Sequence, residues 1–149
     1  MIRRFNDRDE ARLIDMMSRA FSVPVFEPEI VQEELKGSYT SEGYWENISS
    51  EYPLFVDEVD GKIVASGALD GNEIKKLYVD PDMKGKGIGS GMIVFLEGEA
   101  RKNGIDEVKL TAFPFAVSFY EKHGYVASGN VDTPMDSGIM RTVLMKKKI

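Results

Sequence analysis

Hydrophobic positions repeat along this chain with two different spacings, and the first of these is typical of amphipathic helices. Apolar residues three and four apart occupy one face in residues 13–21 and again in residues 92–100. Asp7, followed three residues later by Glu10, is a capping-box pattern that predicts the start of the first helix. Each range is therefore expected to form a helix that packs one face on the core.

Two shorter helices are also indicated. An apolar stripe, residues 30–35, lies between Pro28 and Gly37. Proline is favoured in the first turn of a helix and glycine just beyond its end, so this segment predicts a second helix. Residues 115–122 predict a further short helix, whereas residues 38–50 show neither spacing and receive no predicted element.

The second spacing is the alternation of apolar and polar residues that strands produce. Asp-Gly turns separate three such segments, residues 54–59, 62–69 and 72–79, which predict an antiparallel meander. Further strands are expected at residues 2–5, 108–112, 125–128 and 139–146.

The order of these elements predicts the fold class. The strand that ends at Val79, a glycine-rich turn, a helix and the strand at residues 108–112 form a crossover unit, whose two strands lie parallel. The other strands are joined by shorter connections and are expected to be antiparallel. We therefore expect one α/β domain over residues 1–149, with a mixed, mostly antiparallel sheet and one parallel strand pair.

Composition then narrows the classes of function. With 149 residues and 42% hydrophobic content, the chain can bury one core without metals or disulfides. It has no cysteine and a single histidine, His123, so no metal cofactor is expected. No apolar run reaches the length of about 18 residues that a membrane span needs, and we expect a soluble, cytoplasmic protein. The net charge of −6 argues against a nucleic-acid partner.

Four alternating glycines mark the turn at residues 84–91, which reads K-G-K-G-I-G-S-G. It precedes a predicted helix, whose free backbone N–H groups and positive dipole end favour an anion, and glycine lets the backbone approach phosphate oxygens closely. Neither glycine register matches the dinucleotide-binding fingerprint, and Gly85-Lys86 is followed by Gly87 where a Walker loop needs serine or threonine. The turn predicts a phosphate-bearing cofactor, and a tight turn without a ligand is the alternative.

These residues resemble the signature of the GNAT superfamily of acetyl-coenzyme A (acetyl-CoA) dependent N-acetyltransferases, Q/R-x-x-G-x-G/A, from Lys84 through Gly87 to Gly89. Downstream, Ala116 and the segment F-Y-E-K-H-G-Y at residues 119–125 resemble the family's A-x-x-F-Y-E-K-x-G-F motif. The resemblance implies a GNAT-like fold, in which the central parallel strands splay apart around the cofactor and helices cover both faces of the sheet.

The resemblance also implies acetyl-CoA as the cofactor and a set of binding residues. The pantetheine arm would lie between the splayed strands and meet the backbone of Leu77 and Val79. The pyrophosphate would sit on the glycine turn, where the implied contacts are Lys84, Gly85, Lys86, Gly87, Gly89 and Ser90. Two positions depart from the family pattern: Lys84 replaces the usual arginine or glutamine, and Phe113 replaces an asparagine whose amide often contacts the cofactor.

Acetyl transfer to an amine needs a base for the amine and benefits from an acid for the departing thiolate. Tyr120 has the position of the family's general acid, and packing of the short helix is its alternative role. Glu73, six residues before Val79, has the position of the base in histone-type members. Strand alternation places Glu73 on one face with Leu77 and Val79 unless a bulge intervenes, and an ion pair with Lys75 is the alternative.

Because no cysteine can carry an acyl group, the predicted reaction is direct transfer from acetyl-CoA to a primary amine of a small molecule or peptide in a ternary complex. A coenzyme A binding module without turnover is the alternative. We expect no nucleic-acid or membrane partner, and the sequence leaves a monomer and a homodimer both open.

The acceptor is the least determined part of the prediction. In the family it is contacted mainly by the first two helices and nearby loops, which correspond to residues 21–50. Tyr39, Tyr44 and Trp45 in this region either wall the acceptor pocket or belong to the core. A set of acidic residues favours a cationic acceptor, and a solvated helix face is the alternative. This set is Glu27, Glu29, Glu33, Glu34 and Glu73.

Overall fold

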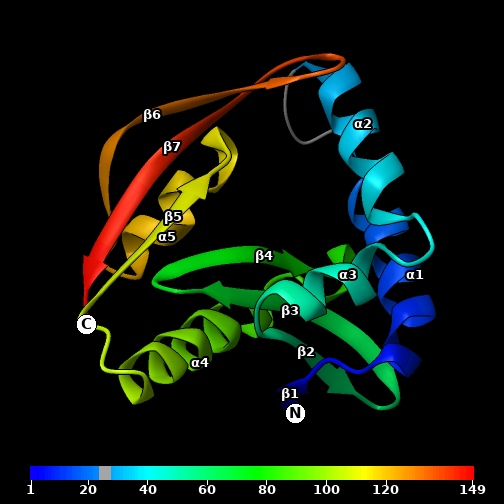
Figure 1. Cartoon of the computed structure of the whole chain (residues 1–149), viewed down its shortest axis with the longest axis horizontal. Helices are drawn as coiled ribbons and strands as arrows, with labels where there is room; N and C mark the ends of the chain where they lie inside the picture. The colour runs from blue at the N-terminus through cyan, green and yellow to red at the C-terminus, as the bar shows by residue number, and fades with distance from the viewer. Residues whose placement is uncertain (24–27) are drawn as a thin grey trace.

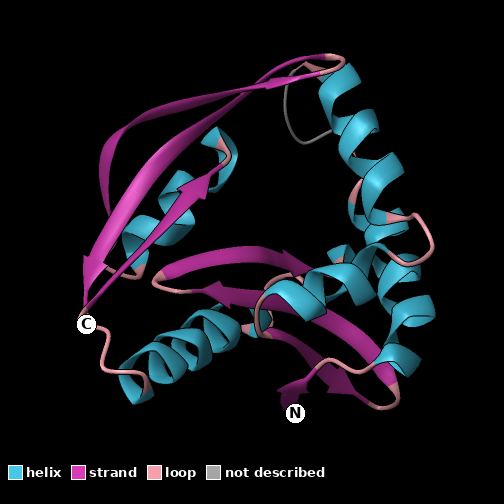
Figure 2. Cartoon of the chain, in the orientation of Figure 1, coloured by secondary structure: helices cyan, strands magenta, loops and turns pink. Residues whose placement is uncertain are grey.

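Seven strands form one mixed sheet in the computed structural model, which describes residues 1–23 and 28–149 (Figure 2). The strands are β1 (Ile2–Arg4), β2 (Leu54–Val59), β3 (Lys62–Asp70), β4 (Glu73–Val79), β5 (Glu107–Ala112), β6 (Val126–Met135) and β7 (Gly138–Lys148). Their order across the sheet is β1-β2-β3-β4-β5-β7-β6, and among these strands only β4 and β5 run parallel. The predicted fold class is therefore confirmed.

Helices cover both faces of the sheet (Figure 1). They are α1 (Glu10–Ala20), α2 (Glu29–Tyr39), α3 (Tyr44–Glu51), α4 (Ile88–Lys102) and α5 (Val117–Lys122). The first three pack on one face, where Leu13, Met16 and Trp45 are fully buried. On the other face, α4 buries Met92 and Leu96 against the sheet, and α5 joins the same core cluster. No helix in the described part of the chain is long and apolar enough to cross a membrane.

The start of α1 is capped one residue earlier than the sequence suggested. Asn6 and Asp9 form a capping box on the short 3-10 turn Asp7–Asp9 that leads into α1, so the predicted box at Asp7 and Glu10 is wrong. Both residue pairs, Asn6 with Asp9 and Asp7 with Glu10, have the spacing of a capping box. Tertiary contacts favour the first pair, because Asp9 also accepts hydrogen bonds from Arg3.

Glu10 instead supports the helix that the sequence did not predict. Its buried carboxylate accepts hydrogen bonds from the backbone N–H groups of Gly43, Trp45 and Glu46, at 3.1, 3.0 and 3.2 Å. These groups belong to the N-terminus of α3, where an acidic side chain is favourable. Helix α3 therefore forms in residues 38–50, which lacked a local signal, because a residue more than 30 positions away caps it.

The parallel strands β4 and β5 are paired at one end only. Glu73 and Lys109 are their single bridging pair, and next to it the Lys109 N–H donates to the Asn72 carbonyl at 3.0 Å. Beyond this point β4 and β5 diverge toward Val79 and Ala112, while β5 stays in register with β7 over its whole length. Figure 1 shows the two halves of the sheet opening in this way.

One ion-pair network fixes the N-terminal strand to α1, and it makes stability depend on pH. Arg3 donates two hydrogen bonds of 2.8 Å to the buried Asp9 carboxylate, and Arg12 donates a third of 2.9 Å. The Arg3 guanidinium lowers the pKa of Asp9 from 3.8 to about 2. This stabilisation is complete above the unfolded-state pKa and is lost as the pH falls from about 4 toward about 2.

Replacing Asp9 by Asn should therefore lower the free energy of unfolding by about 2 kcal/mol at pH 7. The difference from wild type should narrow at pH 3, where the wild-type carboxylate begins to take up its proton. Urea unfolding at both pH values measures this difference. The control is Asp15→Asn on α1, where the exposed carboxylate pairs with Arg19 and should contribute little. If Asp9→Asn lowers the free energy of unfolding equally at both pH values, the charged Asp9 carboxylate is not the source of the stabilisation.

Candidate active site

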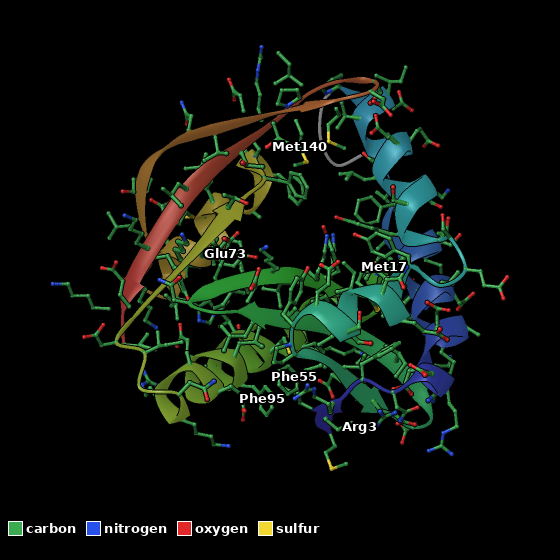
Figure 3. All side chains as sticks on the ribbon, in the orientation of Figure 1. Arg3, Met17, Phe55, Glu73, Phe95 and Met140 are labelled. Carbon is green, nitrogen blue, oxygen red and sulfur yellow. The ribbon has the colours of Figure 1, made fainter. Side chains whose placement is uncertain are left out.

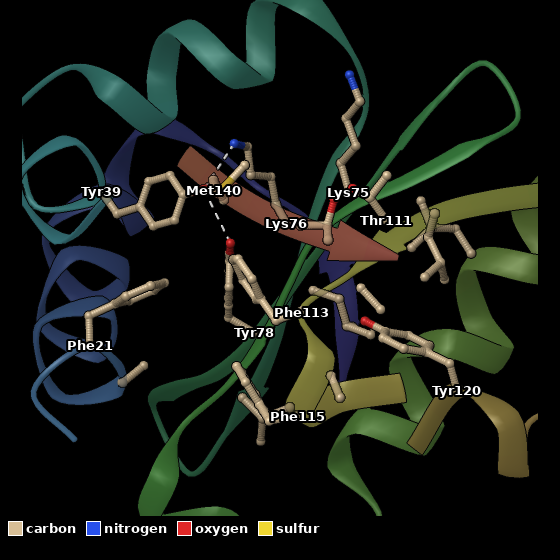
Figure 4. Close-up of a pocket in the computed structure, with 18 of the residues that line it drawn as sticks. Phe21, Tyr39, Lys75, Lys76, Tyr78, Thr111, Phe113, Phe115, Tyr120 and Met140 are labelled. Carbon is tan, nitrogen blue, oxygen red and sulfur yellow. Dashed lines mark hydrogen bonds between the residues drawn. The ribbon is translucent and has the colours of Figure 1, made fainter. Parts of the chain in front are cut away.

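A cavity of about 400 Å³ lies at the diverging ends of β4 and β5, and α1 and α2 contribute to its wall (Figure 4). The predicted site residues that line it are Glu73, Leu77, Val79, Lys84 and Tyr120. The other predicted residues, Gly85, Lys86, Gly87, Gly89 and Ser90, do not line it and continue from Lys84 into the first turn of α4. The predicted residues therefore form one continuous region, made of a cavity and the adjoining turn.

The glycine turn lies where the sequence predicted it, at the start of helix α4. Gly85 and Gly87 have φ values of 78° and 76°, in the left-handed region that favours glycine, and Gly87 is the N-cap of α4. A Cβ atom on Gly87 would meet no other described atom within 4 Å. The surface above Gly87 is therefore open, and the first N–H groups of α4 lie beside it.

Gly89 and Ser90 also have roles within the protein. A Cβ on Gly89 would lie 3.3 Å from Phe119 and 3.4 Å from Val79, so glycine allows α4 to approach α5 and β4 closely. The Ser90 hydroxyl lies 3.0 Å from Nε2 of His123, which links the start of α4 to the end of α5. The Ser90 side chain thus already has a partner, and its backbone N–H is the group for which an anion contact is predicted.

A β-bulge in β4 overturns the predicted orientation of Glu73. Lys76 has a φ of 57°, and the register with β3 shifts between Ser66 and Ala68. As a result, Ile74 and Leu77 share the core cluster under α4 although their spacing is odd. Glu73 therefore faces the opposite side of the sheet from Leu77 and Val79, and the prediction of a shared face is wrong.

Tyr120 projects from α5 toward the cavity (Figure 4). Its ring packs edge-on against Phe119 and Tyr125, with centroids 5.1 and 5.9 Å away, and the side chain is buried. Its hydroxyl makes no hydrogen bond to any described residue. Burial raises the pKa of Tyr120, so the phenol keeps its proton at neutral pH.

The bulge also turns Lys76 toward Tyr39 on α2 (Figure 4) and toward Tyr44 on α3. Lys76 Nζ donates to the hydroxyls of Tyr44 at 2.9 Å and Tyr39 at 3.3 Å, and the Tyr78 hydroxyl donates to that of Tyr39 at 3.1 Å. Burial lowers the pKa of Lys76, but Tyr39 and Tyr44 raise it by more, so the ammonium is charged at neutral pH. We call Lys76, Tyr39, Tyr44 and Tyr78 the lysine–tyrosine cluster.

Sequence reasoning did not assign this cluster to the site. Tyr39 lines the cavity and also belongs to the buried core. Trp45 is fully buried, and its indole N–H donates to the Tyr39 carbonyl at 2.8 Å, while Tyr44 packs against the same core. The missing residue is Lys76, and its position had no signal in the sequence. Regular strand alternation does not predict a β-bulge, and the bulge turns this lysine toward the tyrosines of α2 and α3.

The site thus combines a glycine turn at the start of a helix, two diverging parallel strands and a tyrosine on the next helix. A comparison of the sequence with protein families agrees with this arrangement. The acetyltransferase (GNAT) domain family matches residues 19–149. This chain belongs to that family.

Solved structures agree on the fold of this GNAT domain. A GCN5-related N-acetyltransferase of Rhodopseudomonas palustris is 23% identical with a TM-score of 0.92, over 100% of this chain and 95% of that one. The PaiA N-acetyltransferase of Thermoplasma acidophilum, solved with coenzyme A, is 20% identical with a TM-score of 0.76. The match covers 100% of this chain and 98% of that one. An aminoglycoside 6′-N-acetyltransferase complexed with coenzyme A is 17% identical with a TM-score of 0.72, over 99% and 96%.

Glu73 lies where β4 and β5 converge, at the base of the GNAT cavity (Figure 3). The alternative that it pairs with Lys75 is not observed, because Lys75 Nζ donates to Asp70 at 2.8 Å. Glu73 itself has no ion pair within 4 Å among the residues described. Its carboxylate is therefore available to the cavity, on the side of the sheet that also carries the lysine–tyrosine cluster.

The predicted acidic lining of the cleft is wrong for the glutamates that the structure describes. Of these four, only Glu73 lines the cavity, whereas Glu29 and Glu33 are exposed on α2. Glu34 accepts a hydrogen bond from the Ser137 N–H at 2.7 Å, and Glu27 lies outside the described residues. Among the described residues, the charged ones that line the cavity are Glu73, Lys75, Lys76 and Lys84. Among these, positive charges outnumber negative ones, which removes the reason to expect a cationic acceptor.

Proposed function

We propose that this GNAT acetyltransferase domain transfers the acetyl group of acetyl-CoA directly to a primary amine of a small molecule or peptide while both are bound. The observation that carries the proposal is the cavity between the diverging strands, which continues into an open glycine turn at the start of α4. Relatives of the same fold have been solved with coenzyme A bound.

The turn fits a diphosphate on three independent grounds. Its glycines keep the backbone in the left-handed region, the space over Gly87 is open, and α4 presents its first N–H groups there. Lys84 and Lys86 are exposed beside it, and neither lies within 4 Å of a carboxylate of the described residues. Gly85, Gly87, Gly89 and Ser90 would contribute backbone N–H groups, and the two lysines would add charge.

The backbone of β4 offers donors to the acetyl-bearing end. The Asp80 N–H donates to the Val64 carbonyl of β3 at 2.8 Å, so strand alternation directs the N–H groups of Val79 and Leu77 toward β5. The β4–β5 ladder has already ended there, which leaves these two N–H groups facing the gap. They would bind carbonyl oxygens of the cofactor and favour the negative charge that develops on the acetyl oxygen.

Coenzyme A would supply the acetyl group as a thioester, and the protein's own side chains would handle the protons. An amine with a pKa of about 10.4 is neutral in only about one molecule in a thousand at pH 7, so Glu73 would accept its proton, directly or through water. Tyr120 would donate the phenolic proton to the departing sulfur. The chain has no cysteine to carry the acetyl group, which favours direct transfer.

Gly87→Val tests the phosphate site. A β-branched side chain would fill the open space over the turn, and coenzyme A affinity measured by calorimetry should fall about tenfold or more. Gly98→Ala, in the middle of the same helix with open space for a Cβ, is the control and should leave affinity unchanged. If folded Gly87→Val binds coenzyme A as the wild type does, the phosphates are held elsewhere.

Tyr120→Phe tests the general acid. Coenzyme A release with a panel of primary amines should slow about 100-fold, with the affinity for acetyl-CoA unchanged. Tyr125→Phe is the matched control, because Tyr125 packs on Tyr120 but donates its hydroxyl to Glu97 away from the cavity. Wild-type turnover in Tyr120→Phe would leave Tyr120 with a packing role only. Coenzyme A binding without turnover on any amine would favour a binding module.

Glu73→Gln tests the base. Turnover should fall about 100-fold, and the decline of wild-type rate at acidic pH should disappear from the pH profile. Glu33→Gln, exposed on α2, should behave as wild type. A Glu73→Gln profile that keeps the acidic decline would show that another group removes the proton.

A further inference from the structure

Among the described residues of the cavity wall, Lys76 is a charged residue to which the proposed reaction assigns no role. Lys75 is paired with Asp70, and Lys84 belongs to the glycine turn. No carboxylate of the described residues lies within 4 Å of Lys76 Nζ, although the half-buried side chain packs on two aromatic rings, with Nζ 4.8 Å from the Tyr39 ring centroid and 5.6 Å from that of Tyr44. An ammonium that loses part of its water in this way is normally paired with an anion.

The cluster has more hydrogen-bond donors than it uses. The ammonium carries three N–H groups and each of the three phenols carries one O–H, which makes six donor hydrogens. The cluster makes three internal hydrogen bonds, so three donor hydrogens remain, whichever way each hydroxyl points. The side chains of these four residues make no other hydrogen bond in the described part of the chain. A group that only accepts hydrogen bonds would satisfy these donors.

The cluster lies on the acceptor side of the reaction site. Lys76 precedes Leu77, whose backbone faces the gap where the acetyl group is proposed to lie, but its side chain is directed away from the glycine turn, toward α2 and α3. Apolar side chains line the cavity beside it, among them Phe21, Phe113 and Met140. The cavity thus combines an apolar wall with one cationic, donor-rich site.

We propose that the lysine–tyrosine cluster binds a carboxylate of the acceptor, so that the substrate is an aminocarboxylate with an apolar body. This inference rests on the proposed function, since it specifies the acceptor of that reaction. A carboxylate accepts several hydrogen bonds, and its single negative charge matches the single positive charge of Lys76. A phosphate dianion would need a second cation here, and Lys75 is already paired with Asp70.

The test compares three amines that share the same phenylethyl body, with coenzyme A present: phenylalanine, its equally large amide phenylalaninamide, and 2-phenylethylamine, which lacks the carboxyl group. By calorimetry, the wild type should bind the acid about tenfold or more tightly than the amide or the amine. Lys76→Met should abolish that preference, and Lys76→Arg should restore part of it. Lys75→Met removes the same charge from the neighbouring position of the strand, and it should leave the preference unchanged. Shorter and longer aminocarboxylates, each with its amide, extend the panel.

The outcomes separate this proposal from the proposed function. The carboxylate site is overturned if the wild type binds no carboxylate of the panel or binds acid and amide equally. It is also overturned if Lys76→Met keeps the preference for the acid. Each of these results counts against the site even where amines are acetylated. Preference for O-phosphoethanolamine over every carboxylate would also overturn it. If the acids bind through Lys76 but none is acetylated, the carboxylate site stands and acetyl transfer fails.

Discussion

The site depends on the early end of one β-ladder. After Glu73 and Lys109, β4 and β5 no longer pair, and each is held instead by its outer neighbour. Backbone groups such as the N–H of Val79 are then left without a strand partner, at a cost of about 1–3 kcal/mol for each buried group that stays unsatisfied. A ligand with carbonyl oxygens that lies along this gap would satisfy them, so the same defect that weakens the sheet creates the binding site.

A second irregularity, the bulge at Lys76, distributes the side chains of β4 between the two faces. It leaves Leu77 and Val79 packed toward α4, and it turns both Lys75 and Lys76 toward α1–α3. The left-handed backbone of a non-glycine residue costs about 1–3 kcal/mol, and it is held here by the regular pairing on either side. The acceptor side of the cavity therefore obtains its charge from a strained backbone position.

Local patterns predicted the parts of the fold that local chemistry determines. The Asp-Gly turns gave the meander, and the alternating glycines gave the start of α4. Helix α3 was missed because Glu10 caps it from a distant part of the chain, and α2 continues past Gly37 to Tyr39 because its packing outweighs the local preference of glycine.

For the candidate site, too, the sequence predicted which residues come together but not how each side chain is oriented. Glu73, Leu77, Val79, Lys84 and Tyr120 lie around one cavity, as the motif spacing implied. The orientation of Glu73 and the charge of the acceptor side were not predictable, because they depend on the bulge and on which residues of α2 face solvent. The cluster around Lys76 joins residues from α2, α3 and β4, and no sequence spacing connects these elements.

A crystal structure of this protein with coenzyme A tests the central claim most directly, because it locates the cofactor without knowledge of the acceptor. We expect the diphosphate on the turn at Gly85 and Gly87, the pantetheine arm between β4 and β5, and the sulfur next to the Tyr120 hydroxyl. Coenzyme A bound outside the gap between β4 and β5, or with its sulfur away from Tyr120, would contradict it.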